Sequence, residues 1–105
     1  MMRVDTPGSS ISYSGDTPYG PHIAETAQGC DLLVCEATEP EPVKHGGRRV
    51  HCTPQEAAQA AADGACRRLV LTHCPASRRA AAVDAATAIF PTVEAAAPGA
   101  VYATA

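Results

Sequence analysis

The stretch DLLVCEA, residues 31–37, is apolar along most of its length and shows no period-two alternation. Such a run is typical of a β-strand that is covered on both faces, as strands of parallel sheets are. A second stretch of this kind, RRLVLTH, occupies residues 67–73. Between them, residues 53–56 (TPQE) form a capping box with proline at the first helical position, and the alanine-rich run that follows ends near Gly64. This order of strand, helix and strand predicts two parallel strands joined by a right-handed crossover.

Upstream of this unit, the sequence predicts a β-hairpin and a short helix. Two extended runs flank a Pro-Gly turn, and the second run alternates apolar residues with serines until it ends at Gly15. Gly20 and Pro21 suit the N-cap and the first position of a helix of about two turns, which Gly29 ends. A hairpin and a helix therefore precede the crossover unit.

Downstream and within the unit, the sequence predicts a long loop, a third helix and a closing hairpin. Residues 38–49 contain three clusters of proline or glycine and are expected to form the longest loop of the chain. Ser77 is expected to cap a last helix, which Pro91 terminates. Residues 92–96 and 100–103 then flank a Pro-Gly turn, and we expect them to pair as a hairpin.

Composition and charge narrow the classes of partner. The 105 residues carry a formal net charge of −3, so no overall positive field attracts nucleic acid or an anionic membrane. Three Arg-Arg pairs offer local phosphate contacts at most, which leaves nucleic acid binding open. No apolar run reaches the length of about 20 residues that a membrane span needs. We expect one domain over residues 1–105, located in the cytoplasm and without a membrane partner.

The cysteines argue against a disulfide framework and against a zinc ribbon, because there are five of them and none are in C-x-x-C spacing. We expect most of them to be small buried hydrophobic residues. Two alternatives remain open at this point. One is a structural zinc site that draws on Cys35, His51, Cys52, His73 and Cys74. The other is a cysteine nucleophile activated by histidine, although nothing marks any of the thiols as exposed or acidic.

Polar residues follow the predicted strands where each strand ends. Asp16 comes just after the second strand of the first hairpin. Glu36 and Thr38 lie at the end of the predicted strand around residues 31–37, and His73 closes the predicted strand at residues 67–73. His51 immediately precedes the capped helix and is expected beside them. Because parallel strands end at one edge of their sheet, and ligands of open α/β sheets bind there, these residues should converge. Carboxylate and imidazole together suit zinc, manganese or iron, and they also suit proton transfer.

Each of these residues also has a purely structural interpretation. An aspartate after a glycine and before a helix, as at Asp16, is often a turn former or a cap. A histidine at a strand end, such as His73, is often a hydrogen-bonded boundary residue. Glu36 could simply face solvent. The functional interpretation therefore depends on whether these side chains come together.

The motifs YSGDT (13–17), CEAT (35–38), HCT (51–53) and LTH (71–73) occur in an order and at spacings that resemble the C-terminal half of the metallo-β-lactamase fold. The nearest branch is that of the ribonuclease Z-like hydrolases. The resemblance covers nearly the whole chain and implies an α/β fold, half of an αββα sandwich, with a mixed sheet that carries its helices on one face.

The resemblance also implies roles for four residues. By similarity, Asp16 bridges two metal ions and His73 binds one of them, with zinc as the expected metal and manganese or iron as alternatives. Glu36 orients His51, and His51 protonates the leaving group. The reaction implied is hydrolysis of a phosphodiester or ester, in a nucleic acid or a small molecule, by a metal-bound hydroxide.

Several departures from the family pattern limit this expectation. Cys35 and Cys52 replace a histidine and a serine of the branch motifs, and CPASRR (74–79) replaces its Phe-Ser-x-Arg-Tyr run, which weakens the case for transfer-RNA processing. The main metal motif of the family, H-x-H-x-D-H, is absent from the sequence, so we expect a hydrolase that is incomplete on its own. The alternatives are a non-catalytic, truncated family member that acts as an interaction module, and an unrelated small α/β binding module.

A sheet covered by helices on one face leaves its other face open. Four or five strands present roughly 400 Å² on that face. At about 25 cal/mol per Å², leaving this area in water forgoes about 10 kcal/mol, comparable to the net stability of a domain. We therefore expect a homo-oligomer, a partner chain or a missing N-terminal half to cover the face.

Overall fold

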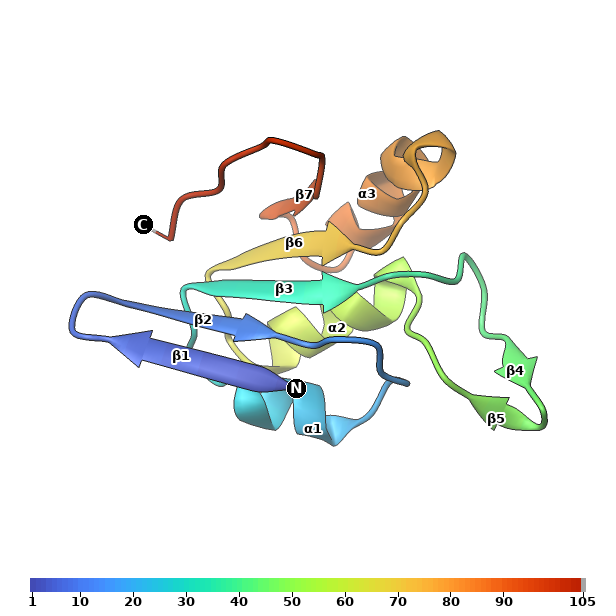
Figure 1. Ribbon diagram of the computed structural model, residues 1–105, viewed down its shortest axis with the longest axis horizontal. Coiled ribbons are helices and arrows are strands. Elements are labelled where there is room, and N and C mark those ends of the chain that lie inside the picture. Colours follow the sequence, from blue (N-terminus) through green and yellow to red (C-terminus); the bar gives the residue numbers. More distant parts are fainter. Residues whose placement is uncertain (105) are drawn as a thin grey trace.

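One mixed sheet of five strands forms the centre of the structure, a computed structural model that describes residues 1–104 (Figure 1). In the sheet, the strands lie in the order β1 (Met2–Thr6), β2 (Ser9–Tyr13), β3 (Leu32–Glu36), β6 (Arg68–Thr72) and β7 (Val93–Ala95). The pair β1 and β2 is antiparallel, and the three other neighbouring pairs are parallel. The α/β class, the mixed sheet and the parallel crossover that the sequence predicts are thus confirmed.

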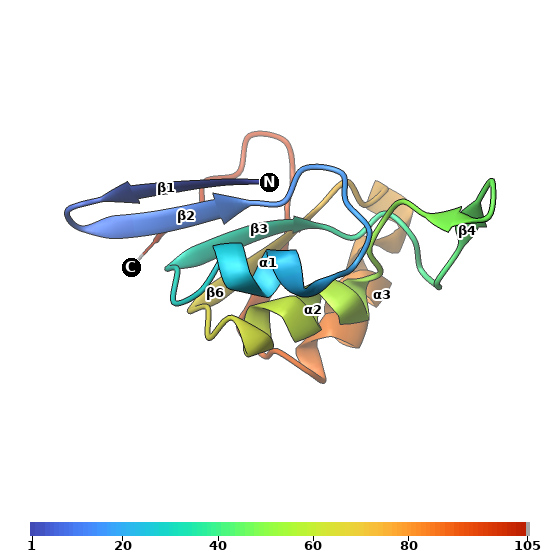
Figure 2. The ribbon, with the colours of Figure 1, turned by 90° about the horizontal axis from the view of Figure 1, so that it is seen from below.

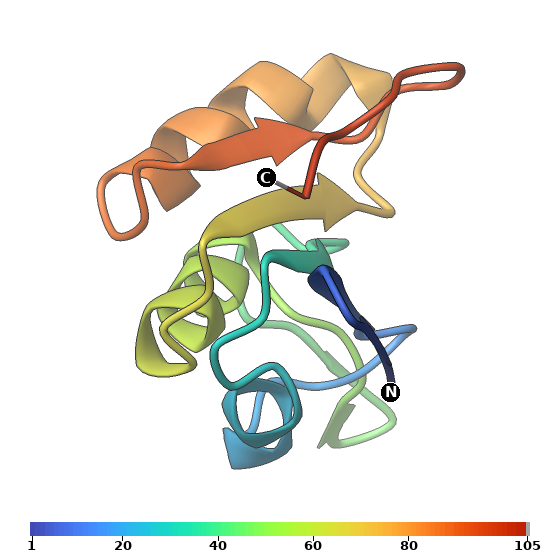
Figure 3. The same cartoon turned by 90° about the vertical axis from the view of Figure 1, so that its left-hand side faces the viewer.

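The three α-helices lie on one face of the sheet (Figure 2). They are α1 (Pro21–Thr26), α2 (Pro54–Asp63) and α3 (Arg79–Thr87), and each lies between two parallel strands in the chain. Figure 3 shows the same arrangement end on, with α1 and α2 to the left of the strands and α3 along the upper part of the view. Within residues 1–104, every helix is too short or too polar to cross a bilayer.

The start of α2 matches the sequence prediction in detail. The Thr53 hydroxyl accepts a hydrogen bond from the Glu56 amide at 3.2 Å, and the Glu56 carboxylate accepts one from the Thr53 amide at 2.9 Å. Pro54 takes the first helical position, where a missing N–H removes no helical hydrogen bond. A cap of this kind stabilises a helix by roughly 1 kcal/mol. The first turn of α2 is therefore firmly placed.

The core lies between the sheet and the helices and is built mostly from small side chains. Leu33 of β3 is paired in register with Leu69 of β6, and Cys35 with Leu71, so these four residues form the floor of the core. Above them lie buried alanines of α2 and α3. Four of the five cysteines are buried and Cys74 is half-buried, which confirms that most are small core residues. Small side chains allow the helices to approach the sheet closely.

The opposite face of the sheet exposes an apolar surface on the hairpin. We call it the β1–β2 patch; it consists of Met2, Val4, Ile11 and Tyr13, which are 61%, 53%, 38% and 48% exposed. Met2 is paired with Tyr13, and Val4 with Ile11, so the four side chains share one face of the hairpin. The expectation of an open sheet face therefore holds over these two strands.

Two parts of the sequence prediction are wrong. Residues 100–103 form no strand, because the segment after β7 is held instead by Tyr102, whose hydroxyl donates to Ala95 O and accepts from Ala97 N, each at 3.0 Å. Ser77 does not cap the last helix, because it lies inside a 3₁₀ turn, η1 (Ala76–Arg78), and α3 begins at Arg79 without a side-chain cap.

The predicted long loop contains a short hairpin that was not expected. Strands β4 (Lys44–His45) and β5 (Arg48–Arg49) pair antiparallel across Gly46 and Gly47. Both glycines have positive φ, +60° and +79°, as a two-residue turn between antiparallel strands requires. The Gly-Gly pair was the sequence signal for this turn. The hairpin projects from the body of the molecule beside the carboxyl ends of the strands (Figure 1).

Candidate functional site

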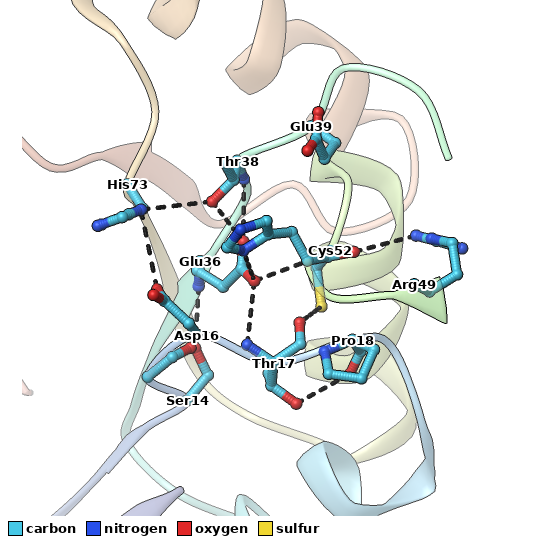
Figure 4. A network of polar contacts seen from close by, with 12 residues as sticks. Ser14, Asp16, Thr17, Pro18, Glu36, Thr38, Glu39, Arg49, Cys52 and His73 are labelled. Atoms are coloured by element: carbon cyan, nitrogen blue, oxygen red, sulfur yellow. Dashed lines mark hydrogen bonds and ion pairs between the residues drawn. The ribbon is translucent and has the colours of Figure 1, made fainter. Parts of the chain in front are cut away.

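The predicted site residues meet at the carboxyl ends of β2, β3 and β6 (Figure 4). Asp16 follows β2, Glu36 is the last residue of β3, and His73 directly follows β6. His51 lies in the segment between β5 and α2, and it reaches Glu36 from there. The sheet topology thus places them together, although they are far apart in the sequence.

Glu36 is the centre of this network. Its side chain is fully buried, and its two carboxylate oxygens accept five hydrogen bonds. Oε1 accepts from Thr17 N at 3.1 Å, from Cys52 N at 3.2 Å and from His51 Nδ1 at 2.9 Å. Oε2 accepts from Thr38 N at 3.0 Å and from Thr38 Oγ1 at 2.7 Å. Glu36 therefore does not face solvent, and it ties together three segments that are distant in the sequence.

The donors around Glu36 decide its charge. Burial raises the pKa of the Glu36 carboxyl, but the hydrogen bonds from Thr38, Thr17 and His51 outweigh burial and hold that pKa below its ordinary value of 4.5. A buried carboxylate is tolerated where several donors satisfy it. Glu36 is consequently an anion near neutral pH.

This charge fixes the orientation of His51. A carboxylate only accepts hydrogen bonds, so the Nδ1 of His51 carries the proton that lies 2.9 Å from Glu36 Oε1. The imidazole is 22% exposed, so the side of the ring that bears Nε2 is the one left for other partners. A histidine held by a carboxylate at one nitrogen can give or take a proton at the other.

The SGDT turn positions Asp16 through its backbone. Ser14 is buried, and its hydroxyl accepts a hydrogen bond from Glu36 N at 3.0 Å and donates one to Gly15 O at 2.8 Å. Gly15 has φ of +61°, in the left-handed region that residues with a Cβ avoid. The turn directs Asp16 away from the core, and its side chain is 61% exposed.

Asp16 and His73 approach each other at the surface of this edge. Asp16 Oδ1 lies 3.8 Å from His73 Nδ1, and Thr38 Oγ1 lies 3.5 Å from the same nitrogen. His73 has φ of +59°, an uncommon conformation for a residue with a Cβ, and such strain is often found at functional sites. Thr38 contacts both Glu36 and His73, so it joins the buried and exposed parts of the site.

Asp16 and His73 fit a metal by the chemistry of their donors but not by their number. Carboxylate oxygen and imidazole nitrogen are ligands that zinc, manganese and iron accept. A catalytic zinc takes three protein ligands, and in residues 1–104 no three side chains of His, Cys, Asp or Glu are grouped to hold an ion. These two residues therefore form part of a ligand set at most.

The cysteine alternatives gain no support from the geometry. The thiolate zinc cluster considered from the sequence would need three of its members together, and the part of the chain that the structure describes holds no such group. Cys52 is buried, and the neighbouring Cys35 together with burial raises the pKa of its thiol. A thiol of this kind is a poor nucleophile.

Three residues that the sequence analysis did not assign to the site support it. Thr17 donates its amide to Glu36, and its hydroxyl lies 2.7 Å from His22 Nε2 in α1. Arg78 of η1 donates to the carbonyl of Thr38 at 2.9 Å. The position of Thr17 inside the SGDT motif was a signal for its role. Nothing local in the sequence indicated His22 or Arg78, because both contacts depend on tertiary packing.

The fold and this edge of polar side chains define an α/β protein of the metallo-β-lactamase type. The metallo-β-lactamase fold protein YhfI of Bacillus subtilis superimposes with a TM-score of 0.83 and 24% identity, over 95% of this chain and 42% of YhfI. Human tRNase Z, short form, superimposes with a TM-score of 0.67 and 26% identity, over 92% of this chain and 34% of the human protein.

Sequence comparison leads to the same class. A family model described as a beta-lactamase superfamily domain matches residues 1–74, a range that includes Asp16, Glu36, His51 and His73. The chain therefore belongs to the beta-lactamase superfamily, with the metallo-β-lactamase fold in a ribonuclease Z-like form. This superfamily is one of hydrolases. The resemblance inferred from the motifs is thereby confirmed.

The sequence relatives are considerably longer than this chain. An uncharacterized protein of Mycobacterium tuberculosis is 39% identical over 75 residues, which are 70% of this chain and 27% of that protein. Ribonuclease Z of Nocardia farcinica is 44% identical over 68 residues, 64% of this chain and 22% of the relative. The chain thus spans about a quarter of the length of the curated relatives that it matches.

Proposed function

We propose that this chain provides the proton-transfer pair and two metal ligands of a metal-dependent hydrolase that cleaves a phosphodiester or an ester. The observation that carries the proposal is the Glu36–His51 pair, in which a fully buried carboxylate with five donors holds one nitrogen of an imidazole at 2.9 Å. Five hydrogen bonds to one carboxylate are expected where the carboxylate has to hold its partner, here the imidazole, in a fixed orientation.

In this proposal, the two residues of the pair have separate roles. Glu36 keeps its negative charge and fixes the ring of His51 through Nδ1. His51 gives a proton to the leaving-group oxygen from the ring nitrogen that faces away from Glu36. Thr17, Thr38 and Cys52 keep the carboxylate in place through their donors.

Asp16 and His73 are the proposed metal ligands. A bound zinc ion, or manganese or iron in its place, would supply a nucleophilic hydroxide at neutral pH and stabilise developing negative charge. Both side chains are more than half exposed, so they are available to an ion that further ligands complete. Thr38, which contacts His73 and Glu36, would hold the metal side and the proton side of the site in register.

The remaining ligands must come from outside this sequence, because two donors do not make a catalytic zinc site. An N-terminal half, a partner chain or a second copy of this chain would supply them. The exposed β1–β2 patch is consistent with such a neighbour, since it lies on the face of the sheet that the helices leave free.

Two of the relatives, ribonuclease Z and human tRNase Z, are named for action on RNA. A phosphodiester is accordingly the substrate class that we favour over a simple ester. We do not extend the proposal to transfer RNA, because the CPASRR run after His73 differs from the pattern of the ribonuclease Z branch.

The test measures metal binding and hydrolysis separately. Zinc binding is measured by titration calorimetry on the chain, on Asp16→Ala and on His73→Ala, with Asp84→Ala and His45→Ala as controls. Asp84 lies on the outer face of α3 and His45 on the β4–β5 hairpin, so the controls remove the same functional groups elsewhere. Loss of zinc binding in the first two variants alone supports the ligand assignment, and equal binding in all five contradicts it.

Hydrolysis of bis-p-nitrophenyl phosphate is then measured with the chain alone and with the N-terminal part of YhfI added. We expect activity only in the mixture, and a loss of that activity in His51→Ala with zinc binding retained. Activity of the mixture that His51→Ala leaves unchanged would contradict the assigned proton donor while sparing the metal ligands.

A second candidate function is supported by the β1–β2 patch. Four large apolar side chains exposed on one face of a hairpin favour a role as an interaction module without catalysis. A stable dimer that binds no zinc in the calorimetric test would favour this alternative.

A further inference from the structure

Cys30 and Cys66 form a buried thiol pair that the proposed hydrolase chemistry does not use. Their Sγ atoms lie 3.6 Å apart, and the two residues are 36 positions apart in the sequence. Cys30 is fully buried and Cys66 is 7% exposed. Both lie at the amino ends of β3 and β6, on the edge of the sheet opposite to Glu36 and His51.

The backbone around the two thiols is already clamped. Gly29 N donates to Gly64 O at 2.7 Å, and Arg67 N donates to Cys30 O at 3.0 Å, so a hydrogen bond lies on each side of the pair. The surroundings are tightly packed, because a Cβ placed on Gly64 would lie 3.3 Å from Cys66 Sγ. The two segments therefore hold the sulfur atoms in contact.

The electrostatic environment favours a thiolate on Cys30. The hydrogen bond with Cys66 lowers the pKa of the Cys30 thiol to about 7, against the opposing effect of burial, and the Ser12 hydroxyl contributes in the same direction. Ser12 Oγ is buried and has no hydrogen-bond partner among the described residues. The same pairing raises the pKa of Cys66, so Cys66 keeps its proton while Cys30 loses its own more readily. A thiolate next to a protonated thiol is the arrangement that precedes disulfide formation.

We propose that Cys30 and Cys66 are a modification site, at which hydrogen peroxide converts the thiol pair into an intramolecular disulfide. The Cys30 thiolate attacks one peroxide oxygen, the O–O bond breaks, and the leaving hydroxide takes up a proton to become water. Cys66 then attacks the sulfur of the Cys30 sulfenic acid. The S–O bond breaks and a second water leaves with the Cys66 proton. The two sulfur atoms lose two electrons and the peroxide gains them. This proposal does not depend on the proposed hydrolase function.

The disulfide would join the turn that follows α1 to the turn that follows α2. Because it closes a long loop of the unfolded chain, it stabilises the folded state, more so since the native backbone already has the two turns in contact. We expect the urea midpoint of the oxidised chain to lie above that of the reduced chain and to return on treatment with dithiothreitol.

The test treats the native, reduced chain with hydrogen peroxide and maps the product by mass spectrometry. We expect a loss of about 2 Da, two hydrogen atoms, and a link between Cys30 and Cys66. Chymotrypsin cleaves after Leu33 and after Leu71, which separates Cys30 from Cys35 and Cys66 from Cys74. Glu-C protease cleaves after Glu56 and separates Cys52 from Cys66. The unmodified sequence therefore suffices to identify the link, even if cysteine variants fail to fold.

Two variants serve as matched controls. Cys66→Ala should lose the 2 Da product, whereas Cys74→Ala, which removes the half-buried fifth thiol, should keep it. A link between any other two cysteines overturns the proposal. Oxidation of Cys74 while Cys30 and Cys66 remain titratable thiols also overturns it.

Discussion

His51 Nδ1 lies 2.9 Å from Glu36 Oε1, although the two residues belong to segments on either side of a hairpin that projects from the fold. The carboxylate of Glu36 is fully buried, so its negative charge lies inside the protein. The imidazole of His51 is partly exposed, so the ring can exchange a proton at the surface. This relationship is the basis of the first two predictions.

Replacing Glu36 by glutamine should destabilise the fold and release His51. The amide keeps the shape of the side chain, but its NH2 group must face at least one of the donors that now point at a carboxylate oxygen. We expect the free energy of unfolding to fall by about 2 kcal/mol, the scale for an unsatisfied buried group, as measured by urea denaturation. Glu25→Gln on α1 is the comparison, because it also removes one carboxylate charge but is exposed and lies outside the site. A loss no larger than in Glu25→Gln would contradict the central role of Glu36.

The same carboxylate should make stability fall in acid. The pKa of Glu36 in the folded chain lies below its ordinary value of 4.5, so its contribution is complete above that value. The contribution is lost as the pH falls through the folded pKa, because protonation then favours the unfolded chain. Urea midpoints measured from about pH 7 down to about pH 3 should decline more steeply for the natural chain than for Glu36→Gln. Parallel curves for the two proteins would argue against this assignment.

The left-handed backbone at His73 should make a glycine at this position stabilising. A residue with a Cβ loses roughly 1 kcal/mol in this conformation, and His73→Gly removes that strain together with the imidazole. Ala65 provides a matched control, since it also has positive φ, +52°, but lies in the turn after α2, remote from the metal ligands. His73→Gly and Ala65→Gly should both raise the thermal midpoint of unfolding, and only His73→Gly should lower the zinc affinity measured by calorimetry. A zinc affinity unchanged in His73→Gly would remove this residue from the ligand set.

The β1–β2 patch should control association. Val4→Glu and Ile11→Glu each place a carboxylate in the middle of the apolar surface, and they face each other across the hairpin. We expect each substitution to reduce the mass measured by light scattering, or to abolish binding of the N-terminal part of YhfI. Val101→Glu is the control, because Val101 is 94% exposed and lies in the segment after β7. If the patch takes part neither in self-association nor in binding of the N-terminal part of YhfI, all three variants will show the same mass and the same binding as the natural chain, which would contradict the prediction.

Much of the fold could be predicted because the relevant signals are local. The capping box at Thr53 and the apolar runs that became β3 and β6 each lie within a few neighbouring residues, and chain order alone then implied a parallel crossover. The Gly-Gly turn of the β4–β5 hairpin was also local, but two-residue strands are too short to show a pattern. Ser77 failed as a cap because a 3₁₀ turn precedes α3, and serine propensity carries no information about such a turn.

The site was predictable to the extent that sheet topology determines it. Asp16, Glu36 and His73 follow strands, so the expectation that parallel strands end together was enough to bring them to one edge. His22 and Arg78 belong to helical segments whose contacts with Thr17 and Thr38 depend on how those segments pack. No spacing in the sequence encodes that packing. The burial of Glu36 was likewise invisible, because it follows from segments that fold over the end of β3.

The cap of α2 and the proposed proton donor share one short segment. Arg49 donates to the His51 carbonyl at 3.1 Å and forms an ion pair with Glu56, while Glu56 completes the capping box with Thr53. Fraying of the first helical turn would therefore loosen the imidazole at the same moment. The opening of this turn can be observed as exchange of its amide hydrogens with deuterated solvent. The imidazole then stays aligned no longer, on average, than the turn stays closed. The first turn of α2 and the alignment of the His51 imidazole should therefore form and open together.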